Sequence, residues 1–270
     1  MEIRALGRSG LQVPVIGMGT WRTLDVSGRA AEERCRAVVS AALEDGARLF
    51  DTSPMYGHAE QVLARCLEGR RDQAIVATKV WTPSARGGRE QIARALDWYG
   101  GRVDVYQIHN LVSWREHLPY LEERRDRGQV SVVGATHYSH GALAELMRVM
   151  VTGRIAQIQV PYNVADRVVE AEVLPAAAQE GIGVIVMQPL GVGALAQRAP
   201  TAEALAPLER FGVRTWPQAL LKWILSDTRV HCAIPATSSV EHMRENAAAG
   251  NPPWFDAAAR DYVTELGARS

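Results

Sequence analysis

LFDTSPMYGHAE (residues 49–60), IVATKVW (75–81) and VDVYQIHN (103–110) are successive segments in which an apolar run ends at polar residues. Each run is almost continuously apolar, which is typical of strands covered on both faces by helices. Helical patterns separate the runs, and strict alternation of strand and helix indicates parallel pairing. The three segments therefore predict neighbouring strands of a parallel sheet, with polar side chains gathered at one edge.

The same alternation extends over most of the chain. It predicts eight strands, at about residues 13–20, 47–53, 74–81, 103–109, 130–136, 155–160, 183–189 and 231–236. Helical spacing of apolar residues is evident between them, for example over 30–45 and 141–151. Glycines follow six of these helical patterns, where a positive φ ends a helix at no steric cost: Gly46, Gly69, Gly100, Gly128, Gly153 and Gly181. The fold class is therefore α/β, a (β/α)8 TIM barrel, and residues 1–270 are expected to form one domain.

Three segments depart from this rhythm. MEIRALGRSGLQV (1–13) predicts a β-hairpin that caps one end of the barrel. About forty residues separate the seventh and eighth strands, more than one helix needs, and GVGALAQRAPTAEALAP within them suits a loop over a ligand. EHMRENAAAG (241–250) predicts an extra helix after the eighth strand, where barrels of this kind often bind phosphate.

Composition excludes several classes of partner. Thirty Lys and Arg balance 30 Asp and Glu, so no overall field favours nucleic acid or an anionic membrane. Three separated cysteines, without a Cys-x-x-Cys pair, argue against a disulfide framework and indicate a reducing compartment. With no signal-peptide pattern and no long apolar run, the expected location is the cytoplasm, and the oligomeric state is left open with a monomer favoured.

Asp51, Lys79 and His109 end the second, third and fourth predicted strands, and Tyr56 lies in the loop just beyond the second. Active sites of these barrels lie at the C-terminal strand ends, so the four side chains should share one space. A tyrosine has a pKa near ~10, and a buried lysine held by an aspartate is expected to lower it, making Tyr56 a proton donor. His137 and His140 have a metal-like spacing, but no third ligand is apparent and no metal is expected.

These motifs resemble the aldo-keto reductase family along nearly the whole chain. The similar stretches are GRSGLQVPVIGMGTW, DTSPMYG, TKVW, QIHN, QVPYN, QPLG and IPATSSVEHMREN. The resemblance implies that Tyr56 is the general acid, that Lys79 and Asp51 lower its pKa, and that His109 directs the carbonyl oxygen. It implies an NAD(P)H-dependent reductase of aldehydes or ketones, able in principle to run as an alcohol dehydrogenase.

The resemblance also implies a set of cofactor residues: Gly19, Thr20, Trp21, Asp51, Thr136, His137, Gln159, Leu190, Gly191, Thr237, Arg244, Glu245 and Asn246. GMGTWR is no Rossmann fingerprint, because Arg22 stands where the third glycine belongs. The chain departs from the family's pattern at Thr136-His137, at Met187 and at Ala236, the last standing where a cation for the 2′-phosphate is common. Arg244, rather than His242, is the expected replacement, so NADPH is favoured and NADH remains possible.

The small-molecule carbonyl substrate is expected to bind against Trp21, Trp81 and Trp114, beside Tyr56 and His109, because aromatic walls suit an apolar body. Two other functions stay open. Lys79 could be the Schiff-base nucleophile of a barrel aldolase, although an Asp51 partner would keep it charged. The chain could also be a non-catalytic redox sensor that binds a nicotinamide dinucleotide.

Overall fold

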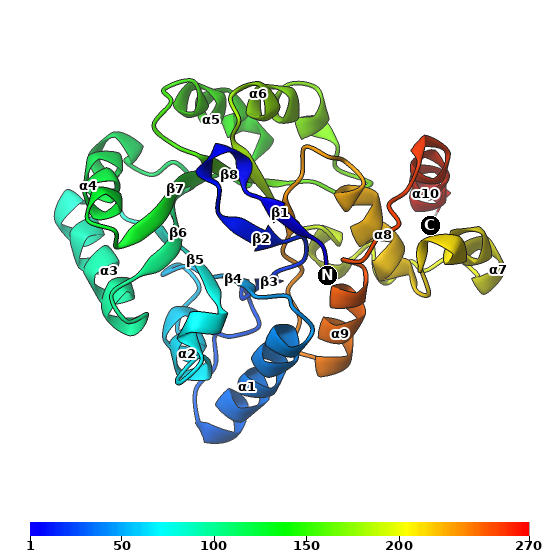
Figure 1. The fold of residues 1–270 in the computed structure, drawn as a ribbon, viewed down its shortest axis with the longest axis horizontal. Coiled ribbons are helices and arrows are strands. Elements are labelled where there is room, and N and C mark those ends of the chain that lie inside the picture. Colours follow the sequence, from blue (N-terminus) through cyan, green and yellow to red (C-terminus); the bar gives the residue numbers. More distant parts are fainter. Residues whose placement is uncertain (270) are drawn as a thin grey trace.

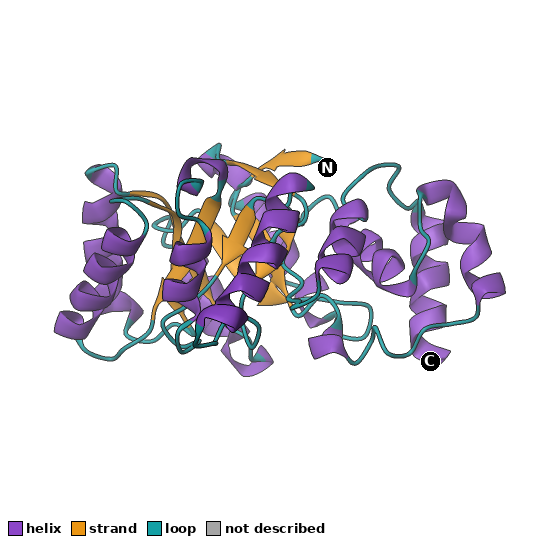
Figure 2. Ribbon diagram, turned by 90° about the horizontal axis from the view of Figure 1, so that it is seen from below, coloured by secondary structure: helices purple, strands orange, loops and turns teal. Residues whose placement is uncertain are grey.

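An eight-stranded parallel sheet forms the centre of the molecule in the computed structural model, which describes residues 1–269 (Figures 1 and 2). Its strands are β3 (Met18–Gly19), β4 (Leu49–Asp51), β5 (Ile75–Val80), β6 (Val103–His109), β7 (Val130–Thr136), β8 (Gln157–Pro161), β9 (Gly183–Met187) and β10 (Cys232–Ala233). Neighbours pair in chain order from β3 to β10. Parallel bridges from Ile16 to Ala233 and from Gly19 to Ala236 join the first strand to the last. The predicted (β/α)8 barrel is confirmed.

Most of the helices surround this sheet, as Figure 1 shows, whereas α7 (Ala202–Leu205) and α10 (Ala257–Arg269) lie to one side of the ring. They are α1 (Arg29–Glu44), α2 (Ala59–Cys66), α3 (Ala85–Trp98), α4 (Trp114–Asp126), α5 (Leu143–Met150), α6 (Val173–Gln179), α7 (Ala202–Leu205), α8 (Trp216–Leu225), α9 (Val240–Ala248) and α10 (Ala257–Arg269). The helices expected over 30–45 and 141–151 correspond to α1 and α5. The six glycines expected at helix ends all have positive φ, between 63° and 83°. The extra helix predicted after the eighth strand is α9.

The first barrel strand is shorter than expected. Residues 13–20 were predicted as one strand, but Gln12–Pro14 form β2, which pairs antiparallel with β1 (Ile3–Ala5), and the barrel strand β3 keeps only Met18–Gly19, with Ile16 adding a single bridge. The reason is that the first residues of the apolar run pair with β1 in the N-terminal hairpin rather than with a barrel strand.

The hairpin closes the N-terminal end of the barrel, as predicted. Leu6 and Val13 are fully buried and pack with barrel side chains that include Leu49 and Val105. The approach is close at Gly7, where an added Cβ would lie 2.3 Å from the backbone nitrogen of Gly183. The opposite end, where the strands finish, is left for a ligand.

Among the described residues, no helix is both long enough and apolar enough to cross a lipid bilayer.

Candidate active site

A buried ion pair lies at the C-terminal ends of β4 and β5. Lys79 Nζ donates to Asp51 Oδ2 at 2.7 Å and to the Thr52 carbonyl at 2.8 Å, and its side chain is completely buried. The other carboxylate oxygen of Asp51 accepts from Gln107 Nε2 at 3.1 Å and Gln159 Nε2 at 2.8 Å. Burial alone would lower the pKa of Lys79, but the Asp51 carboxylate and the Tyr56 hydroxyl together outweigh it and the pKa is raised. Lys79 is therefore a fixed cation at neutral pH.

Tyr56 stands over this cation. The Lys79 nitrogen is 5.2 Å from the centroid of the Tyr56 ring, which packs edge-on against the His109 ring at 5.8 Å. Burial raises the pKa of Tyr56, the Lys79 cation opposes this, and Asp51 adds to the rise, so that the pKa lies above its usual value. The expectation of a lowered Tyr56 pKa is therefore wrong for this site as it stands. Burial, which the sequence does not display, exceeds the effect of the lysine.

His109 ends β6 beside Tyr56. Burial and, secondarily, the Lys79 cation lower the pKa of His109 to about 3, so the imidazole is neutral over the physiological range. Its Nδ1 lies 2.8 Å from the hydroxyl oxygen of Ser53. A neutral imidazole carries its proton on one nitrogen only, and the partner of the other nitrogen decides which.

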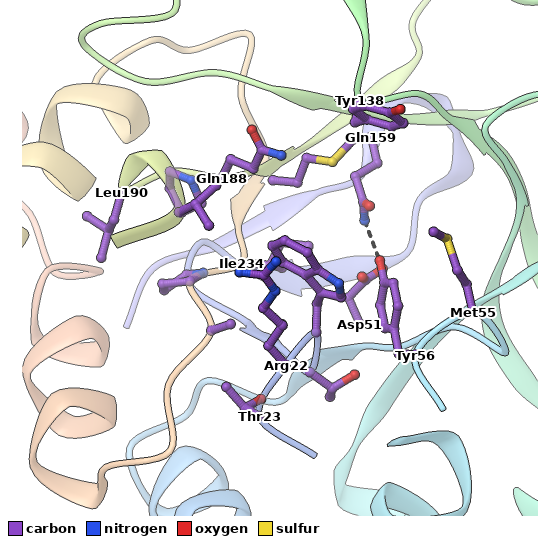
Figure 3. A pocket seen from close by; sticks show the side chains of 18 of the residues that line it. Arg22, Thr23, Asp51, Met55, Tyr56, Tyr138, Gln159, Gln188, Leu190 and Ile234 are labelled. Atoms are coloured by element: carbon purple, nitrogen blue, oxygen red, sulfur yellow. Dashed lines mark hydrogen bonds between the residues drawn. The ribbon is translucent and has the colours of Figure 1, made fainter. Parts of the chain in front are cut away.

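These groups lie on the floor of a pocket of about 560 Å³. Figure 3 shows Gln159 pointing toward Asp51, with Tyr56 and Met55 on one side of the space and Gln188 and Leu190 on the other. Of the predicted site residues, the pocket is lined by Gly19, Thr20, Trp21, Asp51, Tyr56, His109, Gln159 and Leu190. Met187, which departs from the family's aromatic residue, also lines it. The pocket therefore joins the predicted proton donor to much of the predicted nicotinamide site.

Lys79 lies beneath the pocket rather than in its lining, and several other predicted residues also lie outside the lining: Trp81, Trp114, Thr136, His137, Gly191, Thr237, Arg244, Glu245 and Asn246. Thr136 is nevertheless adjacent, because its hydroxyl donates to Gln159 Oε1 at 3.5 Å. His137 Nδ1 accepts from the Ser139 backbone, and burial lowers the pKa of this histidine.

Of the three indoles expected to form the substrate wall, Trp21 is the one in the pocket. Trp81 is partly exposed, with its ring 6.5 Å from that of His109. Trp114 begins α4, and its Nε1 donates to Glu145 of α5 at 3.0 Å. Of the expected three-indole wall, Trp21 lines the pocket and Trp81 lies beside His109.

The residues predicted for the adenosine end follow β10 and continue into α9. Ala236 lines the pocket, the Thr237 hydroxyl accepts from the Ser239 backbone, and Asn246 is buried on α9. Arg244 is exposed and turned toward α1, where its guanidinium lies 3.4 Å from Glu44 and 4.0 Å from Asp45. Exposed pairs of this kind are weak, about 0–1 kcal/mol, so a phosphate could compete for Arg244.

Sequence reasoning missed several residues of the site: Arg22, Ser53, Met55, Gln107, Tyr138 and Gln188. Gln107 and Ser53 could have been predicted from their spacing in the sequence. Each lies two residues from a predicted site residue, His109 and Asp51 respectively, and side chains two apart on a strand face the same side. Tyr138 carries no such signal, since it lies in a loop after β7.

No group of three or more His, Cys, Asp or Glu side chains placed to hold a metal ion occurs in the part of the chain that the structure describes. His140 bonds to Asp166, with Nε2 2.9 Å from Oδ2.

The fold and this strand-end cluster define a barrel enzyme that can place a neutral phenol over a buried ammonium group. A sequence profile of the aldo/keto reductase family matches residues 15–267. The chain therefore belongs to the aldo/keto reductase family, a family of oxidoreductases.

Individual relatives cover almost the whole chain. It is 27% identical over 260 residues to the methylglyoxal reductase YeaE of Escherichia coli (strain K12), covering 92% of this chain and 89% of the relative. It is also 27% identical to the L-galactose dehydrogenase of Arabidopsis thaliana, with 92% and 88% coverage. The holo form of an aldo-keto reductase from Bacillus halodurans superposes with a TM-score of 0.80 at 25% identity, covering 98% of this chain and 96% of that one. An aldo/keto reductase from Klebsiella pneumoniae, solved with NADP and acetate, has a TM-score of 0.82 at 24% identity, with 98% and 94% coverage, and so shares the fold.

Proposed function

We propose that this chain, acting as a single barrel domain, reduces aldehydes or ketones with NADPH and that Tyr56 is the proton donor. The observation that carries the proposal is the fully buried Lys79, bonded to Asp51 at 2.7 Å and held 5.2 Å from the centre of the Tyr56 ring. A buried charge is costly to maintain, so its position beneath a phenol at the floor of a pocket is best explained by catalysis.

The protonation states suit a reduction. Tyr56, with a raised pKa, holds its proton at neutral pH and can donate it. Lys79 stays charged and stabilises the phenolate that donation leaves behind, since an opposite charge within a few ångström favours the ionised form. His109 stays neutral and can direct the carbonyl oxygen through a hydrogen bond without competing for the proton.

The residues around the pocket fit a nicotinamide dinucleotide. Gln159 Nε2 gives one hydrogen to Asp51, which leaves its second for a carboxamide oxygen. The Thr20 hydroxyl is buried and has no protein partner among the described residues. Gly193 lines the pocket, and a Cβ added there would meet nothing within 4 Å, so the backbone faces open space at the point where a phosphate could approach. Arg244 is proposed to meet the 2′-phosphate from α9.

The dihydronicotinamide would supply the hydride, and the chain's own residues would handle the proton and the charge. Tyr56 donates its proton to the carbonyl oxygen while His109 orients that oxygen. Beneath Tyr56, the Lys79 cation stabilises the phenolate, and the Asp51 carboxylate keeps Lys79 charged. The apolar side chains of Trp21, Met55 and Leu190 line the pocket and would limit the access of water to the reacting carbon once the ligands are bound.

The aldolase alternative is disfavoured by the state of Lys79. A Schiff-base lysine must reach its substrate as a neutral amine. Here Nζ is buried, lies outside the pocket lining, is bonded to two oxygens and has a raised pKa.

Tyr56→Phe tests the proposal, because it removes the phenolic proton and little volume. We expect the turnover number for carbonyl reduction to fall by about 10²–10⁴-fold, with the dissociation constant for NADPH changed less than about twofold. Steady-state kinetics and quenching of tryptophan fluorescence measure the two quantities. An unchanged turnover number would remove Tyr56 from the mechanism, and failure of the wild type to bind either dinucleotide would refute the reductase assignment.

A further inference from the structure

Ser53 lies two residues beyond Asp51, and its side chain is fully buried against His109. Its Oγ is 2.8 Å from Nδ1 of the imidazole. The other ring nitrogen, Nε2, has no hydrogen-bond partner among the described residues, and His109 lines the pocket. The serine therefore contacts the histidine at the nitrogen turned away from the ligand.

Counting donors and acceptors fixes the direction of this hydrogen bond. A serine hydroxyl has one proton and two lone pairs. The Met55 backbone N–H donates to Ser53 Oγ at 3.2 Å and occupies one lone pair. If His109 Nδ1 carried the ring proton, it would take the second lone pair and leave the serine proton without an acceptor among the described residues. If Nδ1 is bare, the serine proton has a partner, and only this arrangement satisfies every buried group.

We propose that Ser53 is a positioning residue for carbonyl reduction: its hydroxyl donates to His109 Nδ1 and thereby keeps the imidazole proton on Nε2, directed into the pocket. A ring with the proton on Nε2 can donate to a carbonyl oxygen, whereas the other tautomer would present a lone pair to that oxygen. Burial and the Lys79 cation lower the pKa of His109 to about 3, so the ring has one proton to place. The inference rests on the proposed function, because a carbonyl oxygen is the acceptor.

The same serine also anchors the proton donor. Its carbonyl accepts from the backbone N–H of Tyr56 at 3.0 Å, and its hydroxyl accepts from that of Met55, so Ser53 begins the turn that carries the phenol. One residue thus fixes the orientation of His109 and the start of the Tyr56 turn. Only the contact with His109 depends on the hydroxyl proton, which makes the two roles separable.

Nitrogen-15 NMR of the wild-type protein, labelled at histidine ring nitrogens, reads the tautomer directly and needs no activity. The chain has seven histidines, and the His109 signals are identified by their loss in His109→Gln. We expect a protonated, pyrrole-like Nε2 and a bare, pyridine-like Nδ1. A protonated Nδ1 in the wild type would overturn the proposal whatever the variants do.

Ser53→Ala should shift the His109 nitrogen signals toward a mixture of tautomers. It should also lower the turnover number at least about tenfold while the dissociation constant for NADPH stays within about twofold. Ser53→Thr, which keeps a hydroxyl, should restore the single tautomer. Ser226→Ala is the matched control. The Ser226 hydroxyl also accepts a backbone N–H, from Phe255, and donates to a carbonyl, that of Lys222, but it lies away from the pocket.

If Ser53→Ala gives the same His109 spectrum and kinetics as Ser226→Ala, the serine does not position the imidazole. If Ser53→Ala does not fold, the wild-type spectrum and Ser53→Thr still decide the question. A wild-type protein with the expected tautomer that reduces no carbonyl would refute the proposed function, and with it the role in reduction, while the hydrogen-bond assignment would stand.

Discussion

Asp51→Asn is the most informative single substitution, because all three side-chain bonds of Asp51 are to donors. Oδ2 accepts from Lys79, and Oδ1 from Gln107 and Gln159. An asparagine has one oxygen and one amide group, so whichever way it turns, its N–H₂ meets a donor. The substitution also leaves the Lys79 cation buried without its countercharge.

Breaking a buried ion pair in this way costs about 3–5 kcal/mol. We therefore expect the free energy of unfolding, measured with urea, to fall by that amount and the melting temperature to fall by roughly 6–20 °C. Because the Asp51 carboxylate is the largest of the influences that raise the pKa of Lys79, that pKa should fall and the charge beneath Tyr56 should weaken. Carbonyl reduction at neutral pH should drop by at least about a hundredfold.

Asp104→Asn is the matched control. Asp104 is equally buried and is bonded to Arg71 at 2.8 Å and Arg102 at 2.5 Å, at the N-terminal end of β6 rather than beside the pocket. It should lose less stability, because its arginine partners are partly exposed, and it should keep its turnover number. If the free energy of unfolding of Asp51→Asn lies within about 1 kcal/mol of the wild-type value, the argument from the buried ion pair is refuted. If both variants lose activity equally, the catalytic role of Asp51 is refuted.

Two further predictions concern His109 and Arg244. The unfolded chain protonates His109 below about pH 6.5, but the folded protein does so only near pH 3, so the unfolded state binds more protons between these values. Stability should therefore fall as the pH drops through this window, by roughly 3 kcal/mol at pH 4; urea titrations should show less of this loss in His109→Gln, and equal pH dependence would contradict the burial of a neutral ring. Arg244→Ala should raise the dissociation constant for NADPH about tenfold and leave that for NADH unchanged, measured by tryptophan fluorescence. Glu44→Gln, which frees the guanidinium from one carboxylate, should tighten NADPH binding, and equal responses of the two dinucleotides would exclude Arg244 from the 2′-phosphate.

The barrel could be predicted from the sequence because buried parallel strands have a strong compositional pattern and glycines mark the helix ends. The first and last strands are the exceptions, since each keeps only two residues in the barrel. Residues 13–20 form one apolar run, and periodicity alone does not show that the hairpin takes Gln12–Pro14 while the barrel keeps Met18–Gly19. The division depends on pairing with β1, which is a tertiary contact.

It was also predictable that the site residues lie close together, since the C-terminal ends of parallel strands meet at one edge of the sheet. The bond between Lys79 and Asp51 follows from their places at the ends of adjacent strands. The pKa of Tyr56 was not predictable, because its direction depends on how far burial exceeds the influence of the lysine. Their catalytic roles stay predictions until the variants are measured.

The direction of Trp114 was not predictable either. Three residues just before it, Asn110, Leu111 and Ser113, have positive φ between 45° and 56°. Non-glycine residues rarely adopt this conformation, and no pattern in QIHNLVSW marks it. The backbone therefore turns sharply after His109, and the indole reaches Glu145 rather than the pocket.

The N-terminal hairpin closes the N-terminal end of the barrel. Leu6 and Val13 fill its lower end, and the backbones of Gly7 and Gly183 meet too closely to admit even a methyl group. A ligand must reach and leave Tyr56 through the opposite, C-terminal end of the barrel. The pocket that contains Tyr56 is therefore blind, and a ligand leaves it on the same side as it entered.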